Sequence, residues 1–197
     1  MIGSGKTDTK EVKVGKGQAV EKFTRIRANG PYEIEVSQGP QSAIKITGDD
    51  NIVALVKTRI DDDTFVIETE ENYSTDKPLK ISVTMPEVKG LELNGSGDVS
   101  VSNLDGKELD LELNGSGGFK LNGKVEKLRA EVNGSGDIDA TALEAKQAQA
   151  DISGSGSVRV FAKETLDADI SGSGEVRFKG SPKVNKSVTG SGDVSAL

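Results

Sequence analysis

The chain has 197 residues, 34% of them hydrophobic and 29% charged, and it contains no cysteine, histidine or tryptophan. This composition excludes disulfides, zinc sites with nitrogen or sulfur ligands, and catalytic Cys–His or Ser–His–Asp groups. A formal net charge of −7 argues against nucleic acid or an anionic membrane surface as a partner, because both bind basic patches.

The amino-terminal segment, residues 1–19, is rich in Gly, Lys and Thr and has little periodicity, which predicts a flexible arm. No apolar run is long enough to span a bilayer and no signal peptide is present, so no transmembrane segment is expected. The opening Met1-Ile2-Gly3-Ser4-Gly5 looks like a start codon placed on a trimmed mature sequence.

Residues 20–88 are predicted to form a β-rich cap over the repeats that follow, because an uncovered solenoid end invites aggregation. A turn is expected at Asn29-Gly30-Pro31, between the first two of four strands. The strands are indicated at Phe23–Ile26, Tyr32–Val36, Ile44–Ile46 and Leu79–Val83.

One short helix is expected inside the cap. Ile52, Leu55 and Val56 have helical spacing and follow Asp49, a favourable N-cap residue. The strands after it flank Asp61-Asp62-Asp63 as a hairpin. Three consecutive acids point in different directions, so a solvated turn is favoured here over a metal site.

Residues 89–197 are tandem repeats built around a Gly-Ser-Gly triplet. Apolar residues flank every triplet at strand spacing, so each unit predicts a strand, a bend, a second strand and a looser connector. Units of 18–20 residues indicate an all-β fold, a single right-handed parallel β-helix of about six coils, with a propeller as the alternative. The triplets begin at Gly95, Gly115, Gly134, Gly154, Gly172 and Gly190.

These glycines are interpreted as structural corners, since glycine adopts the backbone angles that a tight bend needs. A phosphate-binding loop is the alternative. It is disfavoured because such a loop leads into a helix and ends in lysine, whereas strands follow every triplet here. No catalytic residue and no cofactor is predicted.

The surface feature with a functional alternative is a column of acids, three residues before each of the first five triplets, with Ser187 at the sixth. If the coils stack in register, these carboxylates lie about 4.8 Å apart and need basic neighbours, screening or bound cations. A solvated face is favoured over a cation-binding or ligand-binding surface. The column consists of Glu92, Glu112, Glu131, Asp151 and Asp169, and a second, broken column consists of Asp98, Asp137, Glu175 and Asp193.

The carboxyl-terminal unit differs from the others. Lys186 occupies a column filled elsewhere by leucine and alanine, and few residues follow Val194. An uncovered edge is a template for another strand, so a homo-oligomer formed through this edge is favoured over a monomer whose edge Lys186 protects.

Residues 20–197 resemble a bacterial family described as "putative auto-transporter adhesin, head GIN domain", found among secreted proteins and lipoproteins of Bacteroidetes. The resemblance is carried by the opening Phe23–Ile26, the Ile34/Val36 strand before Gly39, the exit at Val83–Pro86, and the triplets from Leu93 onward. It implies a β-helical fold and export to the periplasm, outer membrane or exterior.

The first functional hypothesis is therefore a non-enzymatic, adhesin-like interaction module of the cell envelope, whose ligand is a protein or a glycan. The second is a carbohydrate-active β-helix enzyme with paired acids. The third is a structural protein that assembles through its ends.

Overall fold

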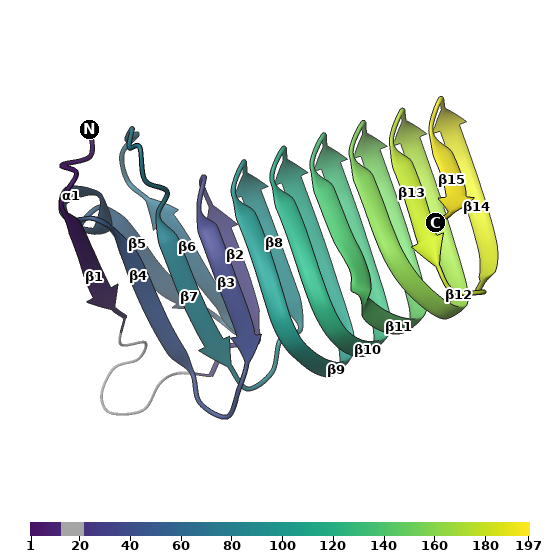
Figure 1. The fold of residues 1–197 in the computed structure, drawn as a ribbon, viewed down its shortest axis with the longest axis horizontal. Helices are drawn as coiled ribbons and strands as arrows, with labels where there is room; N and C mark the ends of the chain where they lie inside the picture. The colour runs from purple at the N-terminus through teal and green to yellow at the C-terminus, as the bar shows by residue number, and fades with distance from the viewer. Residues whose placement is uncertain (13–21) are drawn as a thin grey trace.

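The computed structural model describes residues 1–12 and 22–197, and within them fifteen strands form one continuous sheet. Figure 1 shows this sheet winding into a solenoid whose coils stack along the long axis of the molecule. The predicted all-β solenoid is confirmed.

The regular part of the solenoid begins at β8. Each strand pairs in parallel with its equivalent one coil away, and the triplet glycines are in register, for example Gly95 with Gly115. The sequence predicted about six coils, one for each triplet, whereas the structure has about five turns, because six triplets delimit five intervals. The strands are β8 (Gly90–Gly95), β9 (Asp98–Gly115), β10 (Gly118–Gly134), β11 (Asp137–Gly154), β12 (Ser157–Gly172), β13 (Glu175–Lys179), β14 (Lys183–Gly190) and β15 (Asp193–Ala196).

Each coil has two flat sides. We call the first face the side whose residues lead into a triplet: β8, β14 and the second halves of β9–β12. The second face follows the triplets: β13, β15 and the first halves of β9–β12. The triplets form the sharp upper bend in Figure 1.

The lower bend differs from the prediction in the coils formed by β9–β12, because no looser connector interrupts these strands, whereas residues 180–182 do connect β13 and β14. The strands β9, β10, β11 and β12 each continue through the bend from the second face to the first. The bend is accommodated by register shifts, such as the one between Leu121 and Gly123, and by a positive φ of 59° at Asn103.

The cap is built out of sequence order. The strands β2 (Arg25–Asn29) and β3 (Glu33–Gln38) pair in parallel with β8 and β9, and thus form the coil next to the repeats. On their other side they pair in parallel with the later strands β6 (Thr64–Thr69) and β7 (Lys80–Met85). The first coil in the chain is therefore an interior coil in space. The turn at Asn29-Gly30-Pro31 connects β2 on the first face to β3 on the second face. It does not form a hairpin, since β2 and β3 do not pair with each other.

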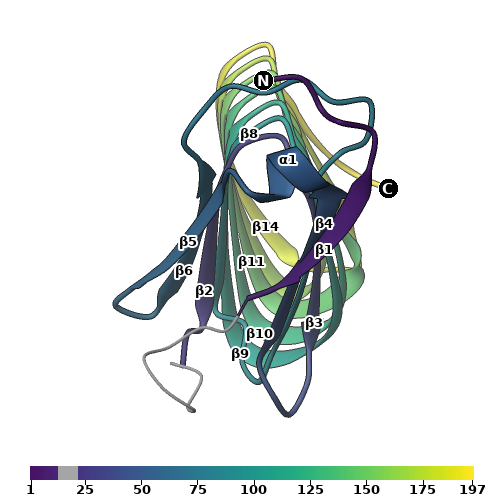
Figure 2. The same ribbon diagram turned by 90° about the vertical axis from the view of Figure 1, so that its left-hand side faces the viewer.

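The outer end of the cap consists of antiparallel strands. β4 (Ala43–Asp49) pairs with β7, and β5 (Val56–Asp61) forms the predicted hairpin with β6. β1 (Thr7–Glu11) pairs with β4, so this part of the expected flexible arm is a strand, and residues 13–19 lie outside the described residues. Figure 2 looks onto this end.

The helix α1 is shorter than predicted and spans only Asp50–Val53, since Val56 already begins β5. The Asp49 side chain forms no capping bond and instead accepts a hydrogen bond of 2.8 Å from the Thr75 hydroxyl. Helical spacing over five residues could not distinguish one buried helical turn from the start of a strand. Buried Ile52 and Val53 nevertheless fill the end of the core here.

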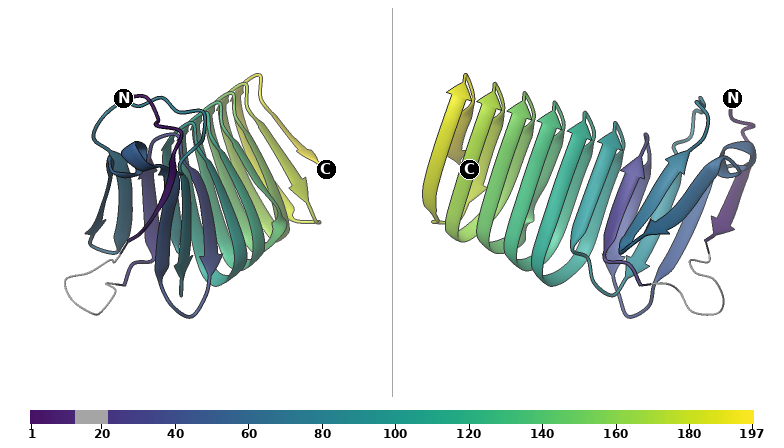
Figure 3. Two further views of the ribbon diagram at one scale, coloured as in Figure 1. Left: turned by 60° about the vertical axis from the view of Figure 1, so that its left-hand side comes forward. Right: turned by 180° about the vertical axis from the view of Figure 1, so that it is seen from behind.

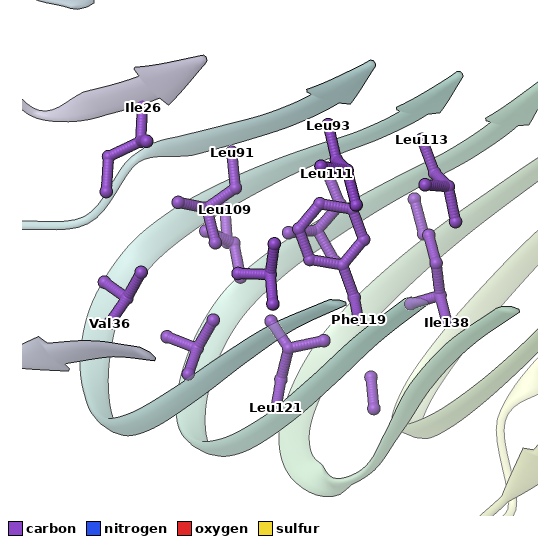
Figure 4. Packing of buried hydrophobic residues seen from close by; sticks show 14 of the residues in the cluster. Ile26, Val36, Leu91, Leu93, Leu109, Leu111, Leu113, Phe119, Leu121 and Ile138 are labelled. Atoms are coloured by element: carbon purple, nitrogen blue, oxygen red, sulfur yellow. The ribbon is translucent and has the colours of Figure 1, made fainter. Parts of the chain in front are cut away.

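The core is the narrow space between the two faces, and Figure 4 shows inward side chains from both meeting there. On the first face, Leu93 and Leu113 are 0% exposed. On the second face, Phe119 and Ile138 are also buried. One inward column shrinks along the axis, which makes the later coils thin: Leu91, Leu111, Ala130, Ala150 and Ala168.

Candidate functional site

The corner glycines are placed in one row at the upper bend. The first glycines of the six triplets have φ between 124° and 143°, which other residues avoid. From Gly115 onward, an added Cβ would lie 2.2–2.4 Å from the carbonyl oxygen of the preceding glycine in the row. Backbone hydrogen bonds run around the bend, such as Ser135 N–H to Gly115 O at 3.0 Å. The row therefore has a structural explanation, and strands, not helices, follow it.

The acidic column is brought together on the first face. Its members pair in register across adjacent strands, from Glu92 through Glu112, Glu131 and Asp151 to Asp169. The register extends to Arg27 of β2 at one end and to Ser187 of β14 at the other. We call these five carboxylates the acidic ladder.

A second ladder lies beside it, two residues further along each strand. From Asn94 onward, each asparagine amide donates to the asparagine oxygen of the preceding coil, for example Asn114 to Asn94 at 2.8 Å. The same amide donates to the carboxylate in its own coil, for example Asn114 to Glu112 at 2.9 Å. We call this set the asparagine ladder, and it consists of Asn29, Asn94, Asn114 and Asn133.

Basic side chains compensate part of the carboxylate charge. The Arg27 guanidinium donates to Glu92 at 2.5 Å, and this carboxylate raises the pKa of Arg27. Arg129 lies 3.4 Å from Glu131 and 3.9 Å from Asp151. Two arginines and the asparagine amide N–H groups thus offset part of the like-charge repulsion between Glu92, Glu112, Glu131 and Asp151.

The compensation weakens toward the carboxyl-terminal coils. Serines replace asparagine at 153 and 171, so Asp151 accepts instead from the Gln149 amide at 2.8 Å. Burial raises the pKa of Asp151, and the nearby Asp169 and Glu131 charges add to the rise. Within the described part of the chain, the side chain of Asp169 forms no hydrogen bond or ion pair, although its backbone pairs within the sheet.

The second acidic column lies on the second face and is interrupted as the sequence indicates. Gly118 stands in register between Asp98 and Asp137, and the Ser157 hydroxyl donates to Asp137. Around Gly118 the surface is hollowed, with a volume of about 500 Å³. This hollow is open, and polar residues such as Lys120 line it.

Neither column forms a metal centre by its geometry. In residues 1–12 and 22–197, no three His, Cys, Asp or Glu side chains are grouped so that they could hold a metal ion. The triple aspartate lies in the β5–β6 hairpin, where Asp63 accepts from Thr24 at 2.8 Å and Asp61 lies 3.6 Å from Arg59. Local partners thus account for two of its three carboxylates.

The sequence did not reveal that Arg27 lies at the end of the acidic ladder and that Asn29 is the first member of the asparagine ladder. A signal was present, since Asn29-Gly30 repeats the Asn-Gly pair of the first three triplets. Because β2 is separated in sequence from β8 by the rest of the cap, its equivalence to a repeat strand is visible only in the pairing of Asn29 with Asn94.

The fold and this surface define a β-solenoid protein with a flat, polar first face. Over residues 22–182 the chain matches the model of the family described as "putative auto-transporter adhesin, head GIN domain", and it belongs to that family.

Solved structures with the same fold include other proteins of this kind. A putative adhesin from Bacteroides fragilis is 27% identical, with a TM-score of 0.79 and 100% of each chain covered. A putative lipid binding protein from Parabacteroides distasonis is 23% identical, with a TM-score of 0.60, covering 100% of this chain and 99% of that one. A putative adhesin from Parabacteroides merdae is 20% identical, also with a TM-score of 0.60, covering 100% and 98%. The last two likenesses show the fold alone.

No curated protein matches the chain. In the described ranges, no helix is long and apolar enough to cross a membrane.

Proposed function

We propose that this protein is an exported, non-enzymatic interaction module that binds an external protein or glycan through the polar strip of its first face. The strip comprises the acidic ladder and the column that contains the asparagine ladder. The family and the Bacteroides fragilis neighbour, both described as adhesins, support an adhesin-like role.

The main support for the proposal is that the polar side chains in the two halves of the strip differ in how many hydrogen bonds they form within the protein. In the first half of the strip the polar side chains bond to one another, because the amides of Asn94, Asn114 and Asn133 each donate two hydrogen bonds. In its second half, the side chains of Ser153, Ser171 and Asp169 have no hydrogen-bond partner among the described residues, and Asp151 is partly desolvated. Exposed groups without internal partners are available to a ligand. Hydroxyls and carboxylates together suit the N–H and O–H donors of a peptide or a sugar.

The enzyme hypothesis is less well supported by this geometry. A glycosidase needs two carboxylates that flank a bond held in a cleft. Here the carboxylates stand in one flat column. The strands β9–β12 run continuously through the lower bend and provide no loop to wall a cleft.

The test is binding of a glycan array and of extracted envelope proteins by three forms of the chain. Asp151→Ala combined with Asp169→Ala removes the second half of the acidic ladder. Asp98→Ala combined with Asp193→Ala removes two acids of the second face and serves as the matched control. We expect the first pair to weaken binding roughly tenfold or more and the control to leave it unchanged, since loss of charged hydrogen bonds has effects of this size.

Equal binding by all three forms would show that the strip is not the binding surface. Release of reducing sugar from a bound glycan, lost in the first variant, would support the enzyme hypothesis instead.

A further inference from the structure

The carboxyl-terminal coil presents an edge that no described strand covers. β14 pairs only with β12, and β15 pairs only with β13. Figure 3 shows both strands at one end of the solenoid, opposite the cap. Val188 is 40% exposed and Leu197 is 59% exposed, although residues equivalent to Val188 in earlier coils are buried. One side of an eight-residue strand thus offers free backbone donors and acceptors.

The charge of this edge is opposite to that of the chain. β14 contains Lys183 and Lys186 and no acid, in a protein whose formal net charge is −7. An edge of this kind repels another copy of itself and attracts a strand that carries negative charge.

Part of this positive charge lies at Lys186, at the open end of the core. Lys186 pairs in register with Ala168, in the inward column that the alanines and leucines fill in other coils. Its ammonium donates to the carbonyl oxygen of Val194, on the opposite face, at 3.4 Å. The Lys186 side chain therefore lies across the open end of the core, between Val184 and Val188 on the same inward side of β14.

These positions specify what could cover the edge. A strand laid against β14 places inward residues opposite Val184, Lys186 and Val188. Apolar residues suit the two valines, but an apolar residue opposite Lys186 would bury an unpaired ammonium, which is strongly unfavourable. In an antiparallel pair of two copies that joins the valines, Lys186 of one copy faces Lys186 of the other, which is also unfavourable.

At the opposite end of the solenoid, the outer strand on the first face is β5, which itself carries Lys57 and Arg59 and so does not complement the lysines of β14 in head-to-tail stacking. The buried residues Ile52 and Val53 of α1 close the core there. Its outer strand on the second face is β1, whose residues are all exposed and which carries acids and a lysine.

We propose that β14 is a docking edge for an extended segment of another polypeptide with the pattern apolar, any residue, acidic, any residue, apolar. The acidic residue pairs with Lys186, and the two apolar residues cover Val184 and Val188. The segment extends the sheet by backbone hydrogen bonds, as in known β-augmentation complexes. Lys186 thus both blocks self-pairing and selects the partner.

The test uses three synthetic peptides with free ends blocked. The first has the sequence Thr-Val-Thr-Glu-Thr-Val-Thr, and the other two replace the central Glu by Gln or Lys. With the full chain at low salt, we expect the Glu peptide to bind roughly tenfold tighter than the Gln peptide and the Lys peptide not to bind. Hydrogen exchange should slow in residues 183–190, and not in β1 or β5.

Charge reversal separates recognition from a folding defect. Lys186→Glu should bind the Lys peptide in preference to the Glu peptide, which a merely damaged protein could not do. Lys183→Glu is the matched control, because Lys183 is not in the inward column and its change should leave the preference for the Glu peptide in place.

Sedimentation over a range of concentrations tests the alternative, in which a second copy of the chain covers the β14 edge. The wild-type chain should be monomeric, and Lys186→Leu should dimerise. A wild-type dimer that is lost when residues 183–197 are removed would overturn the proposal in favour of a second copy. Absence of exchange protection by any peptide, or equal binding of all three, would also overturn it.

Discussion

At the corner between β2 and β3 the chain reads Asn29-Gly30-Pro31-Tyr32, whereas the next coil reads Asn94-Gly95-Ser96-Gly97 at the equivalent positions. Both corners have a glycine with positive φ in second place, 150° at Gly30 and 143° at Gly95. They differ in the fourth place, where the cap has a large aromatic residue and the repeats have glycine.

The difference follows from what lies on the outer side of each corner. A Cβ on Gly97 would lie 2.3 Å from the carbonyl oxygen of Tyr32, and one on Gly117 would lie 2.1 Å from that of Gly97. Beyond Tyr32 there is no such tight corner, because β6 and β7 are joined by the longer connector 70–79. Tyr32 is 0% exposed, and its hydroxyl donates to Asn29 O at 3.0 Å. The second position is thus glycine because of both the positive φ of the bend and the stacked neighbour, and the fourth position is glycine because of the stacked neighbour.

The largest expected effect comes from removing the cap residue that replaces glycine. Tyr32→Ala should lower the free energy of unfolding by about 3–5 kcal/mol, because it leaves a cavity at a fully buried site. Urea denaturation measures the loss. Tyr32→Phe, the matched control, removes only the hydroxyl and should cost about 1 kcal/mol. Similar losses in the two variants would mean that the hydroxyl, and not the filled volume, matters.

The next effect examines the bend in the repeats. Gly134→Ala should cost about 2–3 kcal/mol, because φ is 132° and the new Cβ would lie 2.4 Å from Gly115 O. Gly106→Ala is the control, since no atom lies within 4 Å of its would-be Cβ, and it should change stability by no more than about 0.5 kcal/mol. Equal thermal midpoints for these variants would contradict the corner argument.

A smaller effect compares the two halves of the polar strip. Asn114→Ala removes two donated hydrogen bonds and the acceptor used by Asn133, and should cost about 1–2 kcal/mol. Ser153→Ala, in the same column of a later coil, should cost less than about 0.5 kcal/mol. If both cost the same, the asparagine ladder does not stabilise the first half.

The smallest effect is pH-dependent. The pKa of Asp151 is raised in the fold, chiefly by burial, so its protonated form is favoured there. The resulting stability is fully present below the unfolded pKa of about 3.9 and is lost as the pH rises through the higher folded pKa. Asp151→Asn should therefore raise the thermal midpoint at pH 7 by on the order of 1–2 °C and have little effect near pH 3.

Asp193→Asn, on the second face, is the control for that titration. Addition of millimolar calcium gives a second readout. A calcium-induced rise in the wild-type midpoint that disappears in Glu131→Gln would indicate that cations do bind the acidic ladder.

The repeats could be predicted from the sequence because coils that stack in register require the same kind of residue, apolar or polar, at equivalent positions. The apolar residues that flank the triplets at strand spacing include Val99, Phe119 and Ile138, and all three are buried. The acidic ladder followed from the same register.

The cap could not be predicted in the same way, since its strands pair with partners distant in sequence. The Arg25 side chain passes over Gly90 and forms an ion pair with Asp110, and a Cβ on Gly90 would lie 2.5 Å from the guanidinium. Nothing in the sequence near Arg25 indicates this contact. The compensation of the acidic ladder was equally hidden, because it depends on which amide hydrogen each asparagine presents to which oxygen.

The out-of-order cap has a mechanical consequence. In an ordinary solenoid the first coil in the chain is the end coil, and a pull on the amino terminus peels it away one pair of hydrogen bonds at a time. Here a pull that has detached β1 next loads β2, which is held between β6 and β8 and fastened by the Arg25–Asp110 and Arg27–Glu92 ion pairs. To pull β2 out, the hydrogen bonds to both β6 and β8 must break at the same time. The chain should therefore resist force applied at its amino end better than force applied at its carboxyl end, where β15 can separate from β13 and then β14 from β12, each from a single partner.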